Sequence, residues 1–284
     1  MGTTYHPPGT VRLSLLLGAV GTTLMRQGHI ATFFARAVLS IPVMLRHYGK
    51  EFGRLLSDVT WGNGAIVVGG GTAGVIVVLG GASGAIIGLE GYNALHLLGM
   101  EPAVGLVAST AATREVAPIM ASLAFAAQAG CRFTAQLGAM RNGEEIDAME
   151  SIALRPIPYL VSTRLTASVI AVIPLYLVCL AVNYLVVQVI VDLAGGLSGG
   201  TYHHYFELVL NGPDIAYSLL KAAVFVAVTS TIQCYYGYYA AGGPQGVGIA
   251  TGRGMRAAVS VMIVINLLLT VAIWGLGASA RLGG

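Results

Sequence analysis

The sequence predicts an all-helical membrane protein, with an N-terminal amphipathic helix followed by about five transmembrane helices. Three observations indicate this class. Hydrophobic residues make up 56% of the 284 positions and charged residues only 10%, whereas a typical soluble domain has about 25% charged residues. The mean hydropathy is +0.77. The 39 glycines are typical of membrane helices that pack closely. This composition excludes a soluble enzyme or a disordered chain, and the net charge of +3 is too small for a nucleic-acid-binding module.

The chain is expected to form one domain over residues 1–284, because neither a solenoid-type repeat nor a linker interrupts it. Within it we distinguish an N-terminal interfacial region, 1–60, from a transmembrane bundle, 61–284. The three cysteines, Cys131, Cys179 and Cys234, are too few and too far apart for a disulfide framework.

The first expected element is an amphipathic helix near residues 45–59. Its apolar side chains recur at three- and four-residue steps, and Arg46, Lys50 and Arg54 form a basic stripe. This pattern predicts a helix in the membrane interface, with the basic stripe toward anionic head groups. A soluble helix packed on a partner protein is the alternative.

Five segments are long and apolar enough to cross a membrane, which takes about 20 residues. They are residues 62–89, 103–130, 160–191, 215–236 and 256–276. The first is rich in glycine, so it is expected to be a tilted, broken or re-entrant span.

Basic residues set the expected orientation. Most of the 15 Lys and Arg residues lie in the N-terminal segment, between spans two and three, or between spans four and five. Five spans place all these segments on one membrane face. The opposite loops carry acids instead, namely Glu90, Glu101, Asp192, Glu207 and Asp214. Cytoplasmic loops are enriched in Lys and Arg, so we expect a multi-pass protein of the inner (plasma) membrane. Its N-terminus would be cytoplasmic and its C-terminus would lie on the outer side.

An acidic segment in the basic loop 136–153 is the first candidate site. Gly143 can start a short helix, and Glu144, Glu145 and Asp147 are suited to its first turns, where the helix dipole favours acids. Ile146 and Met149 would share one face of that helix. The pattern indicates either a helix that docks into a cytoplasmic partner or a solvated surface helix.

Arg114, Glu115 and Lys221 are charged residues inside expected spans. Charges within a membrane are costly, and they usually pair with one another or face a pathway. An ion pair between Glu115 and Lys221 and a substrate pathway along all three residues are both possible readings. We place Arg114 and Glu115 halfway along span two and Lys221 in the outer half of span four.

The outer segment around His203 and His204 is expected to be an interfacial helix anchored by Tyr202, Tyr205 and Phe206. His203 and Glu207 are four residues apart, but two ligands are too few for a metal site. No metal site, catalytic residue or cofactor is predicted in this chain. It contains no G-x-x-x-x-G-K-[ST] motif, so any ATP used would be bound by a partner.

The stretch 114–167, REVAPIMASLAFAAQAGCRFTAQLGAMRNGEEIDAMESIALRPIPYLVSTRLTA, resembles the MlaE/YrbE permease family. The pattern of that family runs roughly R-E-x-x-P, A-G-R-x-G, E-L-G-x-M-x-x-x-E-x-I-D-A-L and D-P-x-x-Y-L-x-x-P-R. Two further segments match it, LLKAAVFVAV around Lys221 and GGPQGVGIATGRGMRAAV over residues 242–259.

The resemblance implies the membrane subunit of an ABC transporter that moves lipids. Two permeases would stand on a dimer of cytoplasmic ATPases, which bind ATP and Mg, and would work with MCE-domain proteins that form a tunnel. Residues 140–153 would be the coupling helix that docks into the ATPase. Its contact residues would be Arg141, Glu144, Glu145, Asp147 and Glu150. Arg114, Glu115 and Lys221 would belong to the substrate pathway.

Several positions depart from the family pattern. Gln128 replaces an Arg, Gln136 replaces a Glu, and Arg155 replaces the Asp before Pro156. Ser162 and Thr163 stand where the family often shows a proline before Arg164. These departures argue against a symmetric homodimer. They suit a B-type YrbE subunit of an actinobacterial or mycobacterial Mce lipid importer, paired with a second permease.

Two other functions remain open. A secondary transporter driven by an ion gradient would use Glu115 and Lys221 as a relay. A membrane enzyme acting on lipids would need a catalytic constellation, of which His203 and His204 are the only hint.

Overall fold

The computed structural model describes residues 28–60, 71–195 and 199–275, all of whose regular elements are helices. Three short helices come first, Gly28–Leu39, α2 (Ile41–His47) and α3 (Gly49–Thr60). Five segments able to span a membrane follow, as predicted: α4 (Gly71–His96), Val104–Asn142, Ile157–Ala194, α11 (Gly212–Tyr238) and α12 (Gly243–Trp274). The second span is made of α5 (Val104–Val107), η2 (Ala108–Val116), α6 (Ala117–Phe125), η3 (Ala126–Gly130) and α7 (Cys131–Asn142). The third begins with η4 (Ile157–Ser162) and continues as α9 (Thr163–Gly195).

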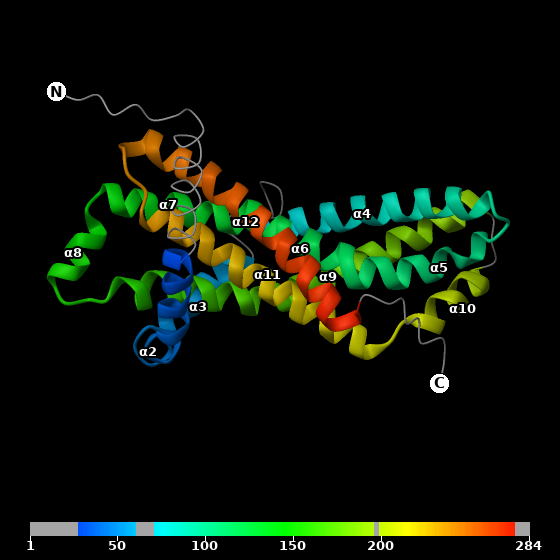
Figure 1. The fold of residues 1–284 in the computed structure, drawn as a ribbon, viewed down its shortest axis with the longest axis horizontal. Helices are drawn as coiled ribbons and strands as arrows, with labels where there is room; N and C mark the ends of the chain where they lie inside the picture. Colours follow the sequence, from blue (N-terminus) through cyan, green and yellow to red (C-terminus); the bar gives the residue numbers. More distant parts are fainter. Residues whose placement is uncertain (1–27, 61–70, 196–198, 276–284) are drawn as a thin grey trace, which may run out of the picture.

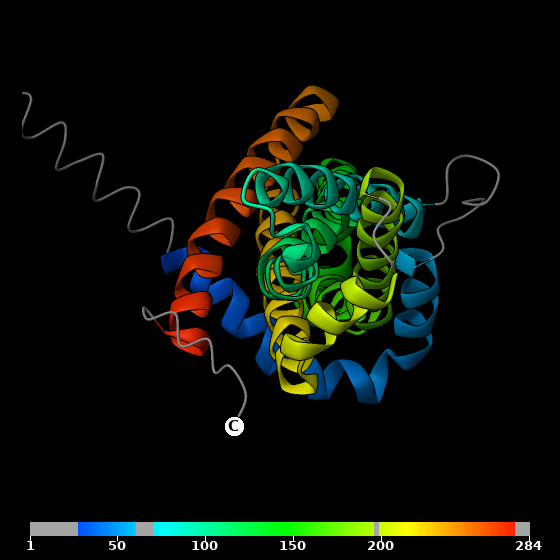
Figure 2. The ribbon, with the colours of Figure 1, turned by 90° about the vertical axis from the view of Figure 1, so that its right-hand side faces the viewer.

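The spans lie along the long axis of the molecule (Figure 1). The connection between spans two and three holds the short helix α8 (Glu145–Ser151) at one end of this axis. The connection between spans three and four holds α10 (Gly199–Val209) at the other end. Seen along the axis, the N-terminal helices curve around one side of the bundle, and α12 crosses its outside (Figure 2).

Several expected boundaries were wrong. The first span continues beyond residue 89 to His96, and its expected start at 62–70 lies outside the described residues. Because it is a single helix from Gly71, the described part is neither broken nor re-entrant. The second span continues past residue 130 to Asn142, and the fifth starts at Gly243 rather than 256. Basic residues in these extensions suggested loops, but helices extend beyond the apolar zone and carry them.

Glycines of α4 allow its close packing on α9. A Cβ at Gly84 would lie 2.6 Å from the backbone oxygen of Asn183, and one at Gly80 would lie 3.0 Å from that of Cys179. Asn183 donates from Nδ2 to the Gly80 oxygen at 3.2 Å and to Ser83 Oγ at 2.8 Å. Close backbone approach of this kind is how small residues stabilise membrane helix pairs, so the glycine content has the predicted structural use at this interface.

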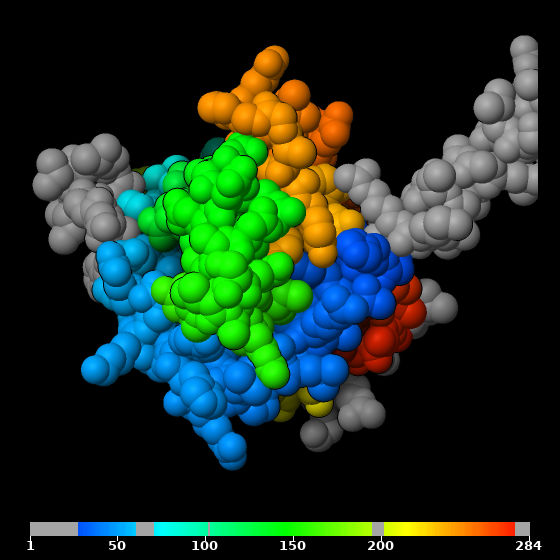
Figure 3. All heavy atoms as spheres, turned by 90° about the vertical axis from the view of Figure 1, so that its left-hand side faces the viewer, coloured from blue at the N-terminus to red at the C-terminus, as the bar shows by residue number. Residues whose placement is uncertain are grey.

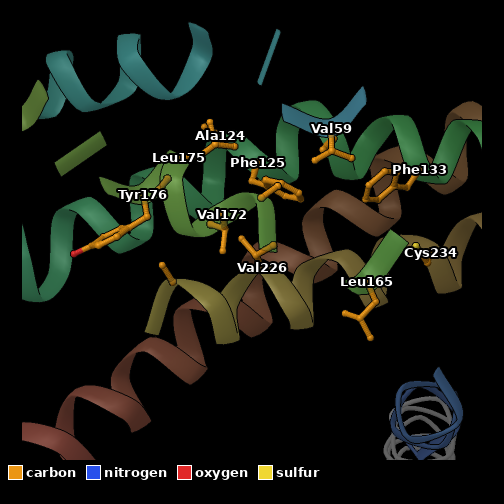
Figure 4. Close-up of a cluster of buried hydrophobic side chains, with 14 of the residues drawn as sticks. Val59, Ala124, Phe125, Phe133, Leu165, Val172, Leu175, Tyr176, Val226 and Cys234 are labelled. Carbon is orange, nitrogen blue, oxygen red and sulfur yellow. The ribbon is translucent and has the colours of Figure 1, made fainter. Parts of the chain in front are cut away.

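The core lies where α6, α9 and α11 meet. Phe125, Val172, Tyr176 and Val226 are fully buried there (Figure 4). By contrast, only 11% of the apolar stretch of α12, on the outside of the bundle, is buried. This helix exposes Ile263, Val264, Leu267 and Leu268. The core therefore fixes the three central spans and leaves an apolar face on α12.

The expected amphipathic helix is divided in two. It breaks at Tyr48, between α2 and α3, and a further bend of 42° separates α2 from the helix Gly28–Leu39. Tyr48 packs against Tyr159 with ring centroids 5.0 Å apart, and Val59 is buried. Arg46, Lys50 and Arg54 are all exposed. The apolar and basic faces are thus segregated along α3, whereas in α2 the apolar Leu45 is exposed next to Arg46.

Candidate functional site

The intramembrane charges lie together in the half of the bundle away from α8, which we call the outer half, as we call the half that carries α8 the inner half (Figure 1). We call the group formed by Arg114, Glu115, Asp214, Lys221, Asn266, Thr270 and Trp274 the outer polar cluster. Its members come from η2, α11 and α12. The second span is 39 residues long and starts at Val104, so Arg114 and Glu115 lie in its outer third. Their expected position halfway along the span was wrong because the span continues to Asn142.

Lys221 is fully buried, and all three of its donors are used. Its Nζ lies 2.9 Å from Glu115 Oε1, 2.8 Å from the backbone oxygen of Arg114 and 2.7 Å from Thr270 Oγ1. Buried charges persist when they are paired and hydrogen-bonded. The structure therefore contains the predicted ion pair between Glu115 and Lys221.

Glu115 is held by two further donors from α12. Thr270 Oγ1 donates to Glu115 Oε1 at 2.6 Å, and Asn266 Nδ2 donates to Oε2 at 2.9 Å. The Glu115 side chain nevertheless remains 34% exposed, while that of Lys221 is not exposed at all. Glu115 is consequently the member of this pair that a ligand or the membrane can reach.

Arg114 makes a second ion pair that the sequence did not predict. Its Nη2 donates to Asp214 Oδ2 at 2.8 Å, and Trp274 Nε1 donates to Asp214 Oδ1 at 3.0 Å. The guanidinium also lies 5.4 Å from the Trp274 ring centroid, within cation–π range. Asp214 was assigned to an outer loop. It belongs instead to the first turn of α11.

The backbone of η2 contributes directly to the cluster. This segment is π-helical, and the backbone oxygen of Arg114 within it accepts from Lys221. The same device recurs where Gln233 Nε2 donates to the Ala126 oxygen of η3 at 2.9 Å, and where Arg164 Nη1 donates to the Leu160 oxygen of η4 at 2.8 Å. No periodicity in the sequence reveals these widened turns. A polar pair, Asn266 and Thr270, four residues apart in an apolar span, was the one available signal for the rest of the cluster.

The acidic helix α8 projects at the opposite end (Figures 1 and 3). Ile146, on the face of α8 that packs on the bundle, is fully buried, while Glu144, Glu145 and Glu150 are exposed. Arg141 Nη1 donates to Asp147 Oδ1 at 2.7 Å and thereby joins the end of α7 to α8. The helix is amphipathic as expected but shorter. Residue 143 does not start it, because Gly143 ends α7 and Glu144, at φ 56°, precedes the first turn.

The outer histidines do not form a site with several ligands. His203 Nε2 lies 3.2 Å from Gln188 Nε2, and no group of three His, Cys, Asp or Glu that could hold a metal occurs in the part of the chain that is described. α10 is helical as expected, but Tyr202 is buried against the bundle and Phe206 packs beside it rather than projecting as interfacial anchors. On the neighbouring turn, a backbone hydrogen bond and the hydrogen bond from His96 lower the pKa of Glu101.

Comparisons with known proteins agree with this architecture. The family model described as permease MlaE matches residues 62–272. A probable ABC transporter permease protein of Rickettsia felis is 30% identical over 195 residues, covering 64% of this chain and 70% of the relative.

Two other relatives carry more specific names. The intermembrane phospholipid transport system permease protein MlaE of Haemophilus influenzae is 28% identical over 191 residues, covering 67% of this chain and 73% of the relative. The chloroplastic protein trigalactosyldiacylglycerol 1 of Arabidopsis thaliana is 30% identical over 173 residues, covering 61% and 49%. Since the family model spans most of the chain and all five candidate spans overlap it, this protein belongs to the MlaE permease family.

Proposed function

We propose that the chain is the permease subunit of an ATP-driven lipid transporter, and that it forms the lipid path together with a second permease. The carrying observation is the outer polar cluster, where a partly exposed Glu115 is held against a buried Lys221. A path that accepts a lipid must carry an apolar tail and a polar head group. A network of this kind, beside the exposed apolar face of α12, supplies both environments.

Membership of the MlaE family supports this proposal, as does the name of the Haemophilus influenzae relative, which refers to phospholipid transport. ATP and Mg would be bound by a cytoplasmic ATPase dimer, and MCE-domain proteins would form the tunnel on the outer side. The changed residues Gln128, Gln136 and Arg155 favour a B-type YrbE subunit in an Mce-type importer of an actinobacterial or mycobacterial envelope. The second permease would then be a different chain. The N-terminus would be cytoplasmic, in the inner membrane.

The role proposed for α8 is mechanical coupling. Glu144, Glu145 and Glu150 face outward from a helix seated on Ile146 and tied down by the Arg141–Asp147 pair. A rigidly seated helix can transmit motion of a bound ATPase to α7 and η4, between which it lies in the chain. Arg46, Lys50 and Arg54 would hold the N-terminal helices at the membrane surface.

Charge reversal tests this coupling role. The double variant Glu144→Lys with Glu145→Lys is expected to lose most ATPase co-purification from mild detergent, because it reverses the charge offered to the partner. Arg256→Glu reverses an exposed charge in α12, away from α8, and serves as the control that keeps the ATPase bound. Undiminished ATPase recovery with the double variant, at wild-type permease yield, would contradict the docking role.

The alternative of an ion-gradient-driven transporter rests on the same Glu115–Lys221 pair. It predicts transport that stops when the proton gradient is collapsed and that needs no ATPase. The family assignment weighs against it.

A further inference from the structure

A groove of about 600 Å³ lies at the end of the molecule that carries α8. One wall comes from the helix Gly28–Leu39 and from α2, and the other from the connection between α8 and η4. Tyr238, near the end of α11, also lines it. Figure 3 shows the N-terminal helices beside α8 at this end. The groove is distinct from the outer polar cluster, which lies toward the other end of the spans.

The groove has two arginines without a counter-ion. Arg36 stands on one wall and Arg155 on the other. Both are exposed, and neither guanidinium has an ion pair or hydrogen bond to any described residue. Glu150 is the only acid among the lining residues, so the lining carries a net charge of +1. Arg155 also occupies the position where the family pattern has an acid, which makes the basic character a property of this chain.

The remaining lining is largely apolar. Leu39 is 78% exposed and Leu154 is 38% exposed, one on each wall. Arg36, Leu39, Ser40 and Val43 follow one another at helical spacing, so a basic side chain is continuous with an apolar stripe. A site with paired cations above apolar walls fits an amphiphile, with its anionic group at the arginines and its hydrocarbon along the leucines.

The position of the groove favours a lipid as this amphiphile. The bent α2 and α3 pair continues from the same wall, and it exposes Arg46, Lys50 and Arg54 beyond its apolar contacts. Basic amphipathic helices lie at the level of the lipid head groups. The groove is therefore continuous with a surface suited to the membrane interface, and of the exposed acids of α8 it includes Glu150.

We propose that this groove binds one anionic phospholipid of the leaflet next to α8, with its phosphate between Arg36 and Arg155. Such a lipid joins the N-terminal helices to the segment that follows α8. Its binding steadies α8 against the bundle, so anionic lipid in this leaflet supports coupling without being the transported molecule.

Native mass spectrometry of the purified full chain in detergent tests the proposal. The probes are phosphatidylglycerol, phosphatidylcholine of the same acyl chains, and inorganic phosphate. We expect the wild type to retain one phosphatidylglycerol in preference to phosphatidylcholine. The double variant Arg36→Gln with Arg155→Gln is expected to lose roughly thirtyfold in that preference, since each arginine near a membrane surface contributes about fivefold and the two effects multiply.

Two further variants separate charge from shape. Arg256→Gln removes an exposed arginine outside the groove and is expected to retain the preference. Leu154→Trp fills the groove without changing charge and is expected to reduce the binding of phosphatidylglycerol. Thermal melting of each variant checks that the fold persists.

Several outcomes overturn the proposal. One is an unchanged lipid preference in the folded double variant, and another is an equal loss in Arg256→Gln. Competition by millimolar inorganic phosphate alone would indicate an anion site that does not require a lipid. If the double variant lost the ATPase partner but kept its lipid preference, the groove would belong to the ATPase interface. The assay requires no transport, so failure of the proposed function would be seen separately.

Discussion

Two buried cations in this protein are compensated in different ways. Lys221, in the outer half of the bundle, is fully buried and lies 2.9 Å from the carboxylate of Glu115. Arg164, toward the α8 end, is 7% exposed, and no carboxylate of the described residues pairs with it. Its Nη2 lies 3.3 Å from the neutral Gln136 and its Nε has no partner. The charge of Lys221 is thus neutralised by a carboxylate of the same chain, whereas the charge of Arg164 is stabilised by neutral hydrogen-bond acceptors.

The difference shows that a buried cation can be retained by two routes. A backbone oxygen of a π-helical segment serves both residues, through Arg114 for Lys221 and Leu160 for Arg164. Only Lys221 also has a group of opposite charge beside it, the carboxylate of Glu115. Arg164 instead lies over the ring of Phe133, with 5.9 Å between its guanidinium carbon and the ring centroid. An uncompensated buried charge is costly. A new carboxylate beside Arg164 should therefore raise the stability of the protein, and loss of the carboxylate beside Lys221 should lower it.

The largest effect is expected at the outer site. Glu115→Gln removes the carboxylate and leaves the buried Lys221 ammonium without an opposite charge, which should lower stability by about 3 kcal/mol. Thermal melting of the purified protein measures this loss. The variant with both Glu115→Gln and Lys221→Met removes the unpaired charge and should recover part of it. If the double variant were no more stable than Glu115→Gln, the ion pair would not explain the effect.

A smaller effect of opposite sign is expected at the inner site. Gln136→Glu places a carboxylate beside Arg164 and should raise stability by about 1 kcal/mol, because a hydrogen bond to a charged group is stronger than one between neutral groups. Gln136→Met keeps the length of the side chain without the charge and is the control. A melting temperature for Gln136→Glu at or below that of Gln136→Met would show that Arg164 needs no counter-ion.

The smallest effect is expected at the rim of the outer polar cluster. In the Arg114–Asp214 pair the side chains are 30% and 16% exposed, so water screens it more than the buried pair. Asp214→Asn should cost less than about 1 kcal/mol, and the amide oxygen can still accept from Trp274. A loss as large as that of Glu115→Gln would mean that the two ion pairs act as one network.

Much of this arrangement was readable from the sequence, because it depends on apolar runs and on isolated charges within them. The five spans, the Glu115–Lys221 pair and the amphipathic α8 belong to this class. The parts that were missed depend on helix geometry. Asp214 entered the cluster because α11 starts earlier than its apolar run, and the π-helical turns at η2, η3 and η4 leave no periodic pattern.

Transport by the reconstituted complex tests the central claim most directly. The permease with its co-purified partners is placed in vesicles, and movement of a labelled phospholipid is followed with ATP, without ATP, and with a proton gradient alone. An ATP-driven permease predicts movement only with ATP, unchanged by an uncoupler and lost when the ATPase is removed. Movement that follows the proton gradient without ATPase would contradict the account and support the secondary transporter.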